Sequence, residues 1–275
     1  MILQNRMKKF LGATFLTGAL LFNTTAADAA SHKSNRETIY QVALLQSLAL
    51  GEFEGSITVG KLKTFGDTGI GTFEGVDGEM IVLDGVVYRA NQQCKINVVD
   101  DKVTVPFSNV TFFDKDFSVK LSNVADKDAL EKILNEQVAK HGRNSFYMVK
   151  ISGEFALMQV RSELGAKKPF NQTLVELLKT QNEVDKENIR GTVVGIYCPD
   201  FMTSLNSAGW HFHFVSEDKK FGGHILGMSV KSGEAQFDKT DAFRMDLPPT
   251  KSFQERNFKA DLREDIRKAE QDSQR

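Results

Sequence analysis

The chain has 275 residues, of which 41% are hydrophobic and 26% are charged, and its 35 basic residues nearly balance its 36 acidic ones. This composition is that of a globular protein, and the length is sufficient for one large domain or two smaller ones with a hydrophobic core. No basic patch interleaved with aromatic residues is present, which excludes nucleic acid as an expected partner.

The N-terminus has the pattern of a secretory signal peptide. Three basic side chains lie between positions 6 and 9, an apolar run covers residues 10–22, and Ala-Asp-Ala at 27–29 is a cleavage pattern. The apolar run is too short for a stable membrane anchor, and no other apolar segment approaches about 18 residues. We therefore expect residues 1–29 to be removed and the mature protein to be exported, to the periplasm or the exterior, with no membrane partner.

Short strands and tight turns fill the first part of the mature chain. We expect a strand over 38–42, a short helix over 43–50 and a strand meander over 51–90 in which Asp77-Gly78 and Asp84-Gly85 form hairpin turns. Two cysteines, Cys94 and Cys198, form no C-x-x-C motif, so neither a thiolate metal site nor a redox dithiol is expected. One structural disulfide and two separate buried cysteines both stay open.

Glu79 directly follows one of these turns and precedes the apolar stretch 80–83. A carboxylate there is either an acid on the solvated end of a hairpin or a functional group in a strand built for burial. The nearby glycines Gly66, Gly69 and Gly71 do not predict a nucleotide site, because no helix follows them whose N-terminus could hold a phosphate. We expect them to permit bulges or close packing between strands.

The remaining elements also alternate between strand and helix patterns. They are expected to be a strand region over 103–113, a helix over 126–141, a strand from 146 that turns into a second strand over 156–161, a helix over 173–179, a strand over 189–197, strands near 228–230 and 235–247, and a charged, partly helical tail over 252–275. Arg161 lies at the end of the second of these strands. By itself, an arginine there is more often a surface or paired residue than an anion-binding one.

This order of elements predicts an α+β fold with two β-rich lobes, built of mixed sheets with a few flanking helices. The domain boundary is expected between residues 170 and 185. It would divide the mature chain into an N-terminal mixed-sheet domain, residues 30–175, and a C-terminal β-rich metal-binding domain, residues 176–275, that includes the charged tail.

Three of the five histidines fall in one predicted hairpin. In the stretch 210–215, Trp-His-Phe-His-Phe-Val, side chains alternate between the two faces of a strand, so His211 and His213 should point the same way. A polar loop and Gly222-Gly223 follow, and His224 can return opposite that pair. Three converging imidazoles with a fourth position left open are typical of a catalytic zinc site. Two polar residues on a solvated strand face are the alternative.

Several motifs, in this order, together resemble the α-acetolactate decarboxylase family over residues 38–270. They are Gly66-Asp67-x-Gly69-x-Gly71-Thr72-Phe73, Asp77-Gly78-Glu79, Arg143-Asn144-x-Phe146-Tyr147, Arg190-Gly191-Thr192-x-Val194-Gly195, and Gly209-x-His211-x-His213-Phe214 followed by Gly222-Gly223-His224. The resemblance implies an enzyme, a carboxy-lyase, that converts 2-acetolactate to acetoin and carbon dioxide. It also implies a homodimer of two-lobed subunits.

The resemblance further implies zinc as the cofactor, with His211, His213 and His224 as its ligands. The family's catalytic residues fall on Glu79, Arg161 and Glu270, with Glu264 as a rival position for the last. Zinc would act as a Lewis acid on the substrate's carbonyl and hydroxyl oxygens. Arg161 would bind either the developing negative charge or the substrate carboxylate, and Glu79 or Glu270 would protonate the enediolate. Manganese, iron or cobalt could replace zinc, since three imidazoles discriminate poorly between these metals.

Two alternatives belong to other classes of protein. A cupin-type metalloenzyme would use the His211-x-His213 pair together with Glu217, although the third histidine then follows sooner than that motif requires. An exported, non-enzymatic module would bind a metal only for stability, with a closed coordination shell.

Overall fold

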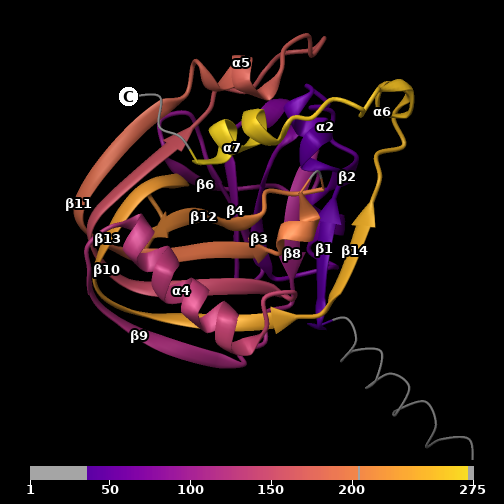
Figure 1. Cartoon of the computed structure of the whole chain (residues 1–275). Helices are drawn as coiled ribbons and strands as arrows, with labels where there is room; N and C mark the ends of the chain where they lie inside the picture. The colour runs from indigo at the N-terminus through magenta and orange to yellow at the C-terminus, as the bar shows by residue number, and fades with distance from the viewer. Residues whose placement is uncertain (1–35, 204, 272–275) are drawn as a thin grey trace, which may run out of the picture. The chain divides into compact units, whose positions relative to one another are not determined.

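The computed structural model describes residues 36–203 and 205–271, and the expected signal peptide lies outside that range. Two sheets with a few flanking helices dominate the described part of the chain (Figure 1), which confirms the expected fold class. None of the described helices is both long and apolar enough to cross a membrane.

The first sheet has seven strands and is mixed, because β1 pairs in parallel with β14 and antiparallel with β8. In spatial order its strands are β14 (Ala242–Asp246), β1 (Thr38–Val42), β8 (Phe107–Thr111), β3 (Thr68–Thr72), β4 (Glu79–Leu83), β5 (Val86–Ala90) and β6 (Ile96–Val98). A separate two-stranded ribbon joins β2 (Ile57–Thr58) to β7 (Thr104–Val105).

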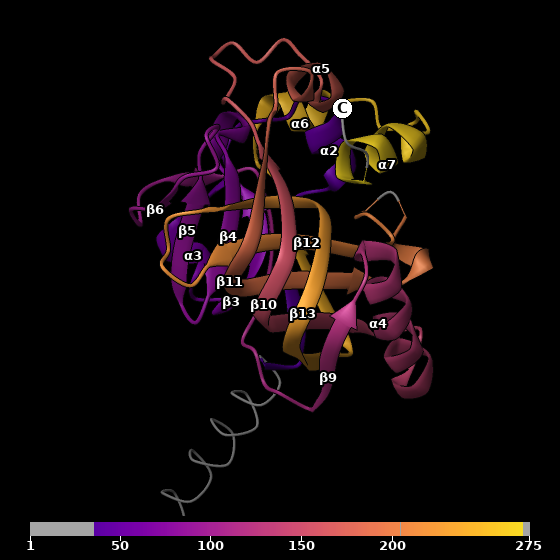
Figure 2. The same ribbon diagram turned by 90° about the vertical axis from the view of Figure 1, so that its left-hand side faces the viewer.

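The second sheet has five strands and curls on itself. In spatial order they are β10 (Phe146–Ser162), β11 (Asn182–Cys198), β12 (Gly209–Ser216), β13 (Gly222–Thr240) and β9 (Phe117–Val124). Because β10 pairs with β13 as well as with β11, the first and fourth strands in this order also meet. Figure 2 shows β10, β11 and β13 as long, strongly bent ribbons.

The turn expected between residues 146 and 161 does not exist. Residues 146–162 form one continuous strand, β10, whose register shifts at bulges between Glu154 and Phe155 and further along the strand. Gly153 marks a close approach of strands, since a Cβ there would lie 2.2 Å from the Ser232 carbonyl oxygen. A glycine in a strand pattern can mark either a turn or a close approach of two strands, and Gly153 marks a close approach.

The sheets do not follow the domain boundary expected at residues 170–185. Strands β9 and β10 precede that boundary yet belong to the five-stranded sheet, and β14 from the end of the chain pairs with β1 in the seven-stranded sheet. Sequence periodicity identifies strands but not their partners, and these long-range pairings join residues up to about 200 positions apart. The described residues, taken from 36 onward, lie in one compact unit.

The predicted helix over 126–141 is α4 (Lys127–His141), which begins after the capping residue Asp126. Its Leu130, Leu134 and Val138 are buried against the five-stranded sheet. The remaining helices are short: α2 (Leu45–Ala49), α3 (Val59–Leu62), α5 (Leu174–Leu178), α6 (Lys251–Glu255), α7 (Arg263–Gln271), and the 3₁₀ turns η1 (Glu74–Val76) and η2 (Asp200–Met202). Helices α2, α5 and α7 contact one another and cover the same end of the sheets (Figures 1 and 2).

Apolar residues of both sheets meet in a core between them, which includes Ile70, Ile81, Met148 and Val215. The two cysteines are buried in different clusters, Cys94 under the five-stranded sheet and Cys198 between the sheets, and neither forms a disulfide. Burial raises the pKa of the Cys94 thiol to about 12, so this cysteine stays protonated.

Candidate metal centre and active site

The predicted alternation along β12 is confirmed. Trp210, Phe212 and Phe214 pack into the core beneath α4, and His211 and His213 point to the opposite face, toward the seven-stranded sheet. The Trp210 indole donates a hydrogen bond of 2.9 Å to Asn135 of α4, which anchors this strand to the helix. Because the aromatic face is fixed, the histidine face is fixed with it.

A row of paired residues brings the other functional groups to the same place. His213 of β12 lies directly opposite His224 of β13, and His224 in turn lies opposite Arg161 of β10. Gly223 permits this approach of strands, because a Cβ there would lie 2.5 Å from the Arg161 carbonyl oxygen. The expected return of His224 opposite the His211/His213 pair is thus confirmed.

Three ring nitrogens converge on one point. The Nε2 atom of His211 lies 3.1 Å from Nε2 of His213 and 3.0 Å from Nδ1 of His224. Three nitrogens bound tetrahedrally to one ion at about 2.0–2.1 Å would lie about 3.3 Å apart. All three side chains are buried, and they form the one group of potential metal ligands found among the described residues.

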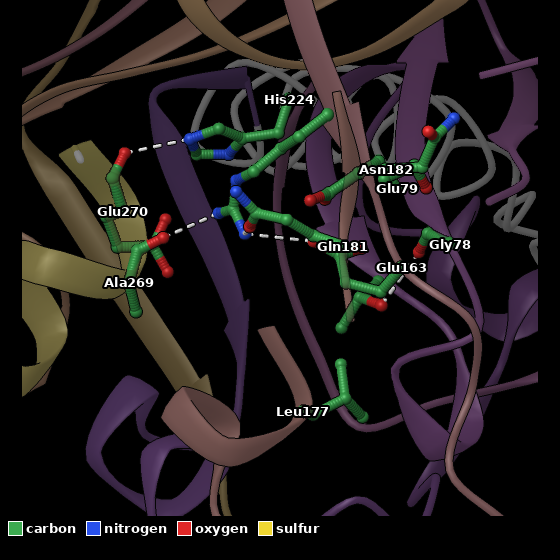
Figure 3. A network of polar contacts seen from close by, with 12 residues as sticks. Gly78, Glu79, Glu163, Leu177, Gln181, Asn182, His224, Ala269 and Glu270 are labelled. Atoms are coloured by element: carbon green, nitrogen blue, oxygen red, sulfur yellow. Dashed lines mark hydrogen bonds and ion pairs between the residues drawn. The ribbon is translucent and has the colours of Figure 1, made fainter. Parts of the chain in front are cut away.

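Backbone carbonyls set the tautomers of two of these rings. His213 Nδ1 donates to the Met80 carbonyl oxygen at 2.7 Å, and His224 Nε2 donates to the Glu270 carbonyl oxygen at 2.8 Å (Figure 3). A carbonyl can only accept, so each of these neutral rings directs a lone pair to the shared point. His211 can donate a proton to only one of them. A cation bound by all three nitrogens satisfies every lone pair, and the histidines therefore fit a metal.

Two carboxylates approach the same nitrogens. Oε2 of Glu79 lies 3.3 Å from Nε2 of His213, and Oε2 of Glu270 lies 3.1 Å from Nε2 of His211. The Glu270 Oε2 atom accepts no hydrogen bond within the described residues. An oxygen that faces a lone pair is stabilised only when a cation or a proton lies between them, which agrees with the metal site.

Burial determines the protonation of these groups. It lowers the pKa of His211 to about 3, with a further lowering from the Arg161 cation, and it holds the pKa values of His213 and His224 well below their usual range. The imidazoles are therefore neutral at physiological pH, the form that binds metals.

Burial also raises the pKa values of the two carboxyl groups. The pKa of Glu270 rises to about 7, and that of Glu79 rises well above its ordinary value, with a further increase from the neighbouring Glu163 carboxyl.

The turn before Glu79 fixes the direction of its side chain. Gly78 takes a positive φ of 86°, and a Cβ there would lie 2.3 Å from the Ala90 carbonyl oxygen, so glycine is required. The Thr72 hydroxyl donates to the Gly78 carbonyl at 2.9 Å, and Asp77 pairs with Arg89 at 2.6 Å. Glu79 then begins β4 as a buried residue, not as a solvated hairpin end.

Arg161 is buried, and hydrogen bonds hold two of its three guanidinium nitrogens. Its Nη1 donates to Glu163 and to Gln181, both at 3.0 Å, and its Nη2 donates to the Ala269 carbonyl oxygen at 2.6 Å. Nε has no hydrogen-bond partner within the described residues. Figure 3 shows Ala269 and Glu270 on one side of this network and Glu163 and Gln181 on the other.

The sequence analysis missed Glu163 and Gln181. Glu163 is only 1% exposed and lies two residues after Arg161, so that an i, i+2 pair of opposite charges at the end of an apolar strand was the available signal. Gln181 precedes β11 and is placed only by the pairing of β10 with β11. No local pattern identifies it.

The final helix, α7, places Glu270 beside the histidines. Ile266 and Ala269 of α7 pack with α2 and α5, and Glu270 lines the same pocket as Glu79, Arg161 and the three histidines. Glu264 lies in the first turn of α7 and is exposed. Of the two rival positions, the structure brings Glu270 to the histidines.

Glu217, the ligand of the cupin alternative, lies outside this site. It is exposed in the turn between β12 and β13 and pairs with Arg190 at 3.2 Å. The pocket at the histidines instead combines three imidazoles, three carboxyls and one guanidinium with an apolar wall that includes Leu48, Val76 and Leu178. Neither the cupin reading nor a closed structural metal site is favoured by this arrangement of ionisable groups.

Comparisons with known proteins agree with this geometry. The family model of alpha-acetolactate decarboxylase matches residues 39–260. Proteins of that name from Methanosarcina mazei and Brevibacillus brevis are 36% and 34% identical, over 85% and 82% of this chain and 80% and 78% of their own. The crystal structure of the protein from Bacillus subtilis, 31% identical, superposes with a TM-score of 0.82 over 86% of this chain and 100% of its own. The chain belongs to the α-acetolactate decarboxylase family.

Proposed function

We propose that this protein decarboxylates 2-acetolactate to acetoin and carbon dioxide. The observation that carries the proposal is one buried pocket in which three neutral imidazoles converge beside two protonatable carboxyl groups and a guanidinium. A 2-hydroxy-3-keto acid presents the complementary groups, namely a carboxylate for the guanidinium and neighbouring hydroxyl and carbonyl oxygens for a cation.

We propose zinc as the resident metal, held by His211, His213 and His224. Neutral imidazoles without a thiolate suit zinc, and the carbonyl partners of His213 and His224 hold two of the rings in the ligating tautomer. When bound, zinc supplies Lewis acidity to the carbonyl and hydroxyl oxygens of the substrate.

Arg161 is proposed to bind the substrate carboxylate through Nε. Nε is the one guanidinium nitrogen without a hydrogen-bond partner within the described residues, because Glu163, Gln181 and Ala269 accept three of the five N–H bonds from the other two nitrogens. One N–H of Nη2 is left over beside it. A donor without a partner at a buried site is stabilised by an incoming anion, because the N–H otherwise stays desolvated and unpaired.

Glu79 and Glu270 are the proposed proton donors. When the bond to the carboxylate breaks, its electron pair moves toward the ketone oxygen, and the carbon that lost carbon dioxide takes up a proton. Burial raises the pKa of both carboxyl groups, so each can hold a proton near neutral pH. The two approach the histidines from different elements, β4 and α7, and offer protons from two directions.

The direct test is acetoin formation from racemic 2-acetolactate by the mature protein, with the metal stripped by a chelator and then restored. We expect activity to disappear with the metal and to return with zinc, and elemental analysis of the purified protein to identify the native ion. Absence of acetoin from folded, metal-loaded protein would refute the proposed reaction. Full activity in protein proven metal-free would refute the role of the metal.

We also propose that the protein is exported and forms a homodimer. The basic, apolar and Ala-Asp-Ala segments of residues 1–29 support export, and the family resemblance supports the dimer. The mature N-terminus should be Ala30 when the protein is recovered from the periplasm or the medium. Light scattering should give twice the mass of one chain.

A further inference from the structure

Glu163 is a buried carboxylate to which the proposed reaction assigns no part. It follows the last residue of β10 and is 1% exposed, although no charged residue is buried without a cost in free energy. Its Oε1 accepts the hydrogen bond from Arg161 Nη1 at 3.0 Å, its Oε2 has no hydrogen-bond partner within the described residues, and it lines the same pocket as Glu79. It therefore pairs with the cation of the site and lies near one of its acids.

Three anchors on separate segments hold the guanidinium plane. Glu163 follows β10, Gln181 precedes β11, and Ala269 belongs to α7. The Gln181 amide is itself oriented, because its Nε2 donates to Glu183 at 2.8 Å while its oxygen accepts from Arg161. Glu163 and Gln181 both bind Nη1, so together they fix the rotation of the guanidinium and the direction in which Nε points.

We infer that Glu163 is a positioning residue that aims Nε of Arg161 at the substrate carboxylate. This inference rests on the proposed function and deepens it. In this role Glu163 acts through Arg161, so that the guanidinium is aligned before the substrate binds.

A simpler role for Glu163 is to neutralise a buried arginine. The two roles differ in what glutamine can replace. Glu163→Gln removes the charge but keeps an oxygen that can accept from Arg161, so it preserves positioning and abolishes neutralisation. Glu163→Ala removes both. A small misplacement of a binding group costs roughly 10²-fold in rate, which sets the size of the effect to expect.

The experiment measures kcat and KM for acetoin formation, together with metal content and Tm, on the full mature protein. We expect Glu163→Ala to lose about 10²-fold in kcat with a smaller change in KM, and Glu163→Gln to stay within about tenfold of the wild type, both with the metal retained. Glu217→Ala is the matched control, since Glu217 also pairs with an arginine but lies exposed. It should behave as the wild type.

Two results would overturn the inference: Glu163→Gln as impaired as Glu163→Ala, or Glu163→Ala within threefold of the wild type. If Glu163→Ala does not fold, Gln181→Ala decides, because Gln181 holds the same nitrogen; a loss in kcat with the metal retained supports positioning, and unchanged kcat opposes it. Absence of acetoin from the wild type would instead refute the proposed function. Acetoin formation by the wild type, together with an unchanged kcat in the Glu163→Ala variant, would refute only this inference.

Discussion

Glu79 and Glu270 offer protons under different electrostatic conditions. Burial is the main reason that each pKa is raised, and the Arg161 cation partly offsets it at both groups, but only Glu79 has neighbouring carboxyls, those of Glu163 and Glu270, that raise its pKa further. A neighbouring carboxylate makes it harder for a carboxyl group to lose its proton. Glu79 is therefore the group more firmly protonated at neutral pH.

Glu79→Gln should consequently leave the metal bound and lower kcat by about 10²–10⁴-fold, the range for loss of a general acid or base. The amide matches the carboxyl in size but cannot donate a proton to carbon. Elemental analysis and steady-state kinetics on the same sample check both statements, with Glu217→Gln as the surface control. Near-normal turnover of this variant would show that Glu79 does not take part in the reaction. Loss of the metal would show that Glu79 helps to bind it.

At the scale of elements, α7 depends on a neighbour for its position. The side chain of Gln46 in α2 donates to the carbonyl oxygens of Phe258 and Ala260, at 3.2 and 2.8 Å, in the segment that leads into the helix. These two bonds and the apolar contacts of Ile266 and Ala269 place the helix end that carries Glu270. Its last carbonyls then accept from Arg161 and His224.

We expect Gln46→Ala to lower kcat several-fold and to speed hydrogen exchange in α7. The variant loses two hydrogen bonds, each of which contributes about 1 kcal/mol net to stability. The three histidines stay in place, so metal content should not change. Gln254→Ala is the matched control. The Gln254 side chain also donates to a backbone carbonyl, that of Pro248, but Gln254 belongs to α6. Equal kinetics and equal exchange in both variants would show that α7 does not need this anchor.

The same elements mark what the sequence could and could not predict. Alternation along a strand placed His211 and His213 on one face, and the 3.6-residue period gave α4, because both patterns are local. The continuity of β10 through Gly153 and the pairing of β10 with β13 are long-range and left no local signal. The tautomers of His213 and His224 depend on carbonyls at Met80 and Glu270, far away in the chain.

For the molecule as a whole, the connection between the two sheets contains a buried carboxyl group. Asp238 of β13 is 1% exposed and accepts a hydrogen bond of 3.3 Å from the backbone N–H of Asp114, in the segment between β8 and β9. Burial, together with the neighbouring Asp116, Glu37 and Asp114, raises its pKa to about 8. In the unfolded chain an aspartate titrates near about 3.9.

The folded protein therefore holds a proton on Asp238 that the unfolded chain has lost, and folding stability must fall as the pH rises from about 4 to about 8. Asp238→Asn keeps an oxygen for the Asp114 N–H but does not titrate. Its Tm should match the wild type near about pH 4 and exceed it increasingly up to about pH 8, at roughly 2–4 °C per kcal/mol for a chain of this size. Calorimetric scans of metal-loaded protein across that range provide the test, with the exposed Asp101→Asn variant as a control that should gain nothing with rising pH. A Tm difference that stays constant or shrinks between about pH 4 and about pH 8 would mean that Asp238 is ionised in the folded protein, and that a buried charge lies where the two sheets connect.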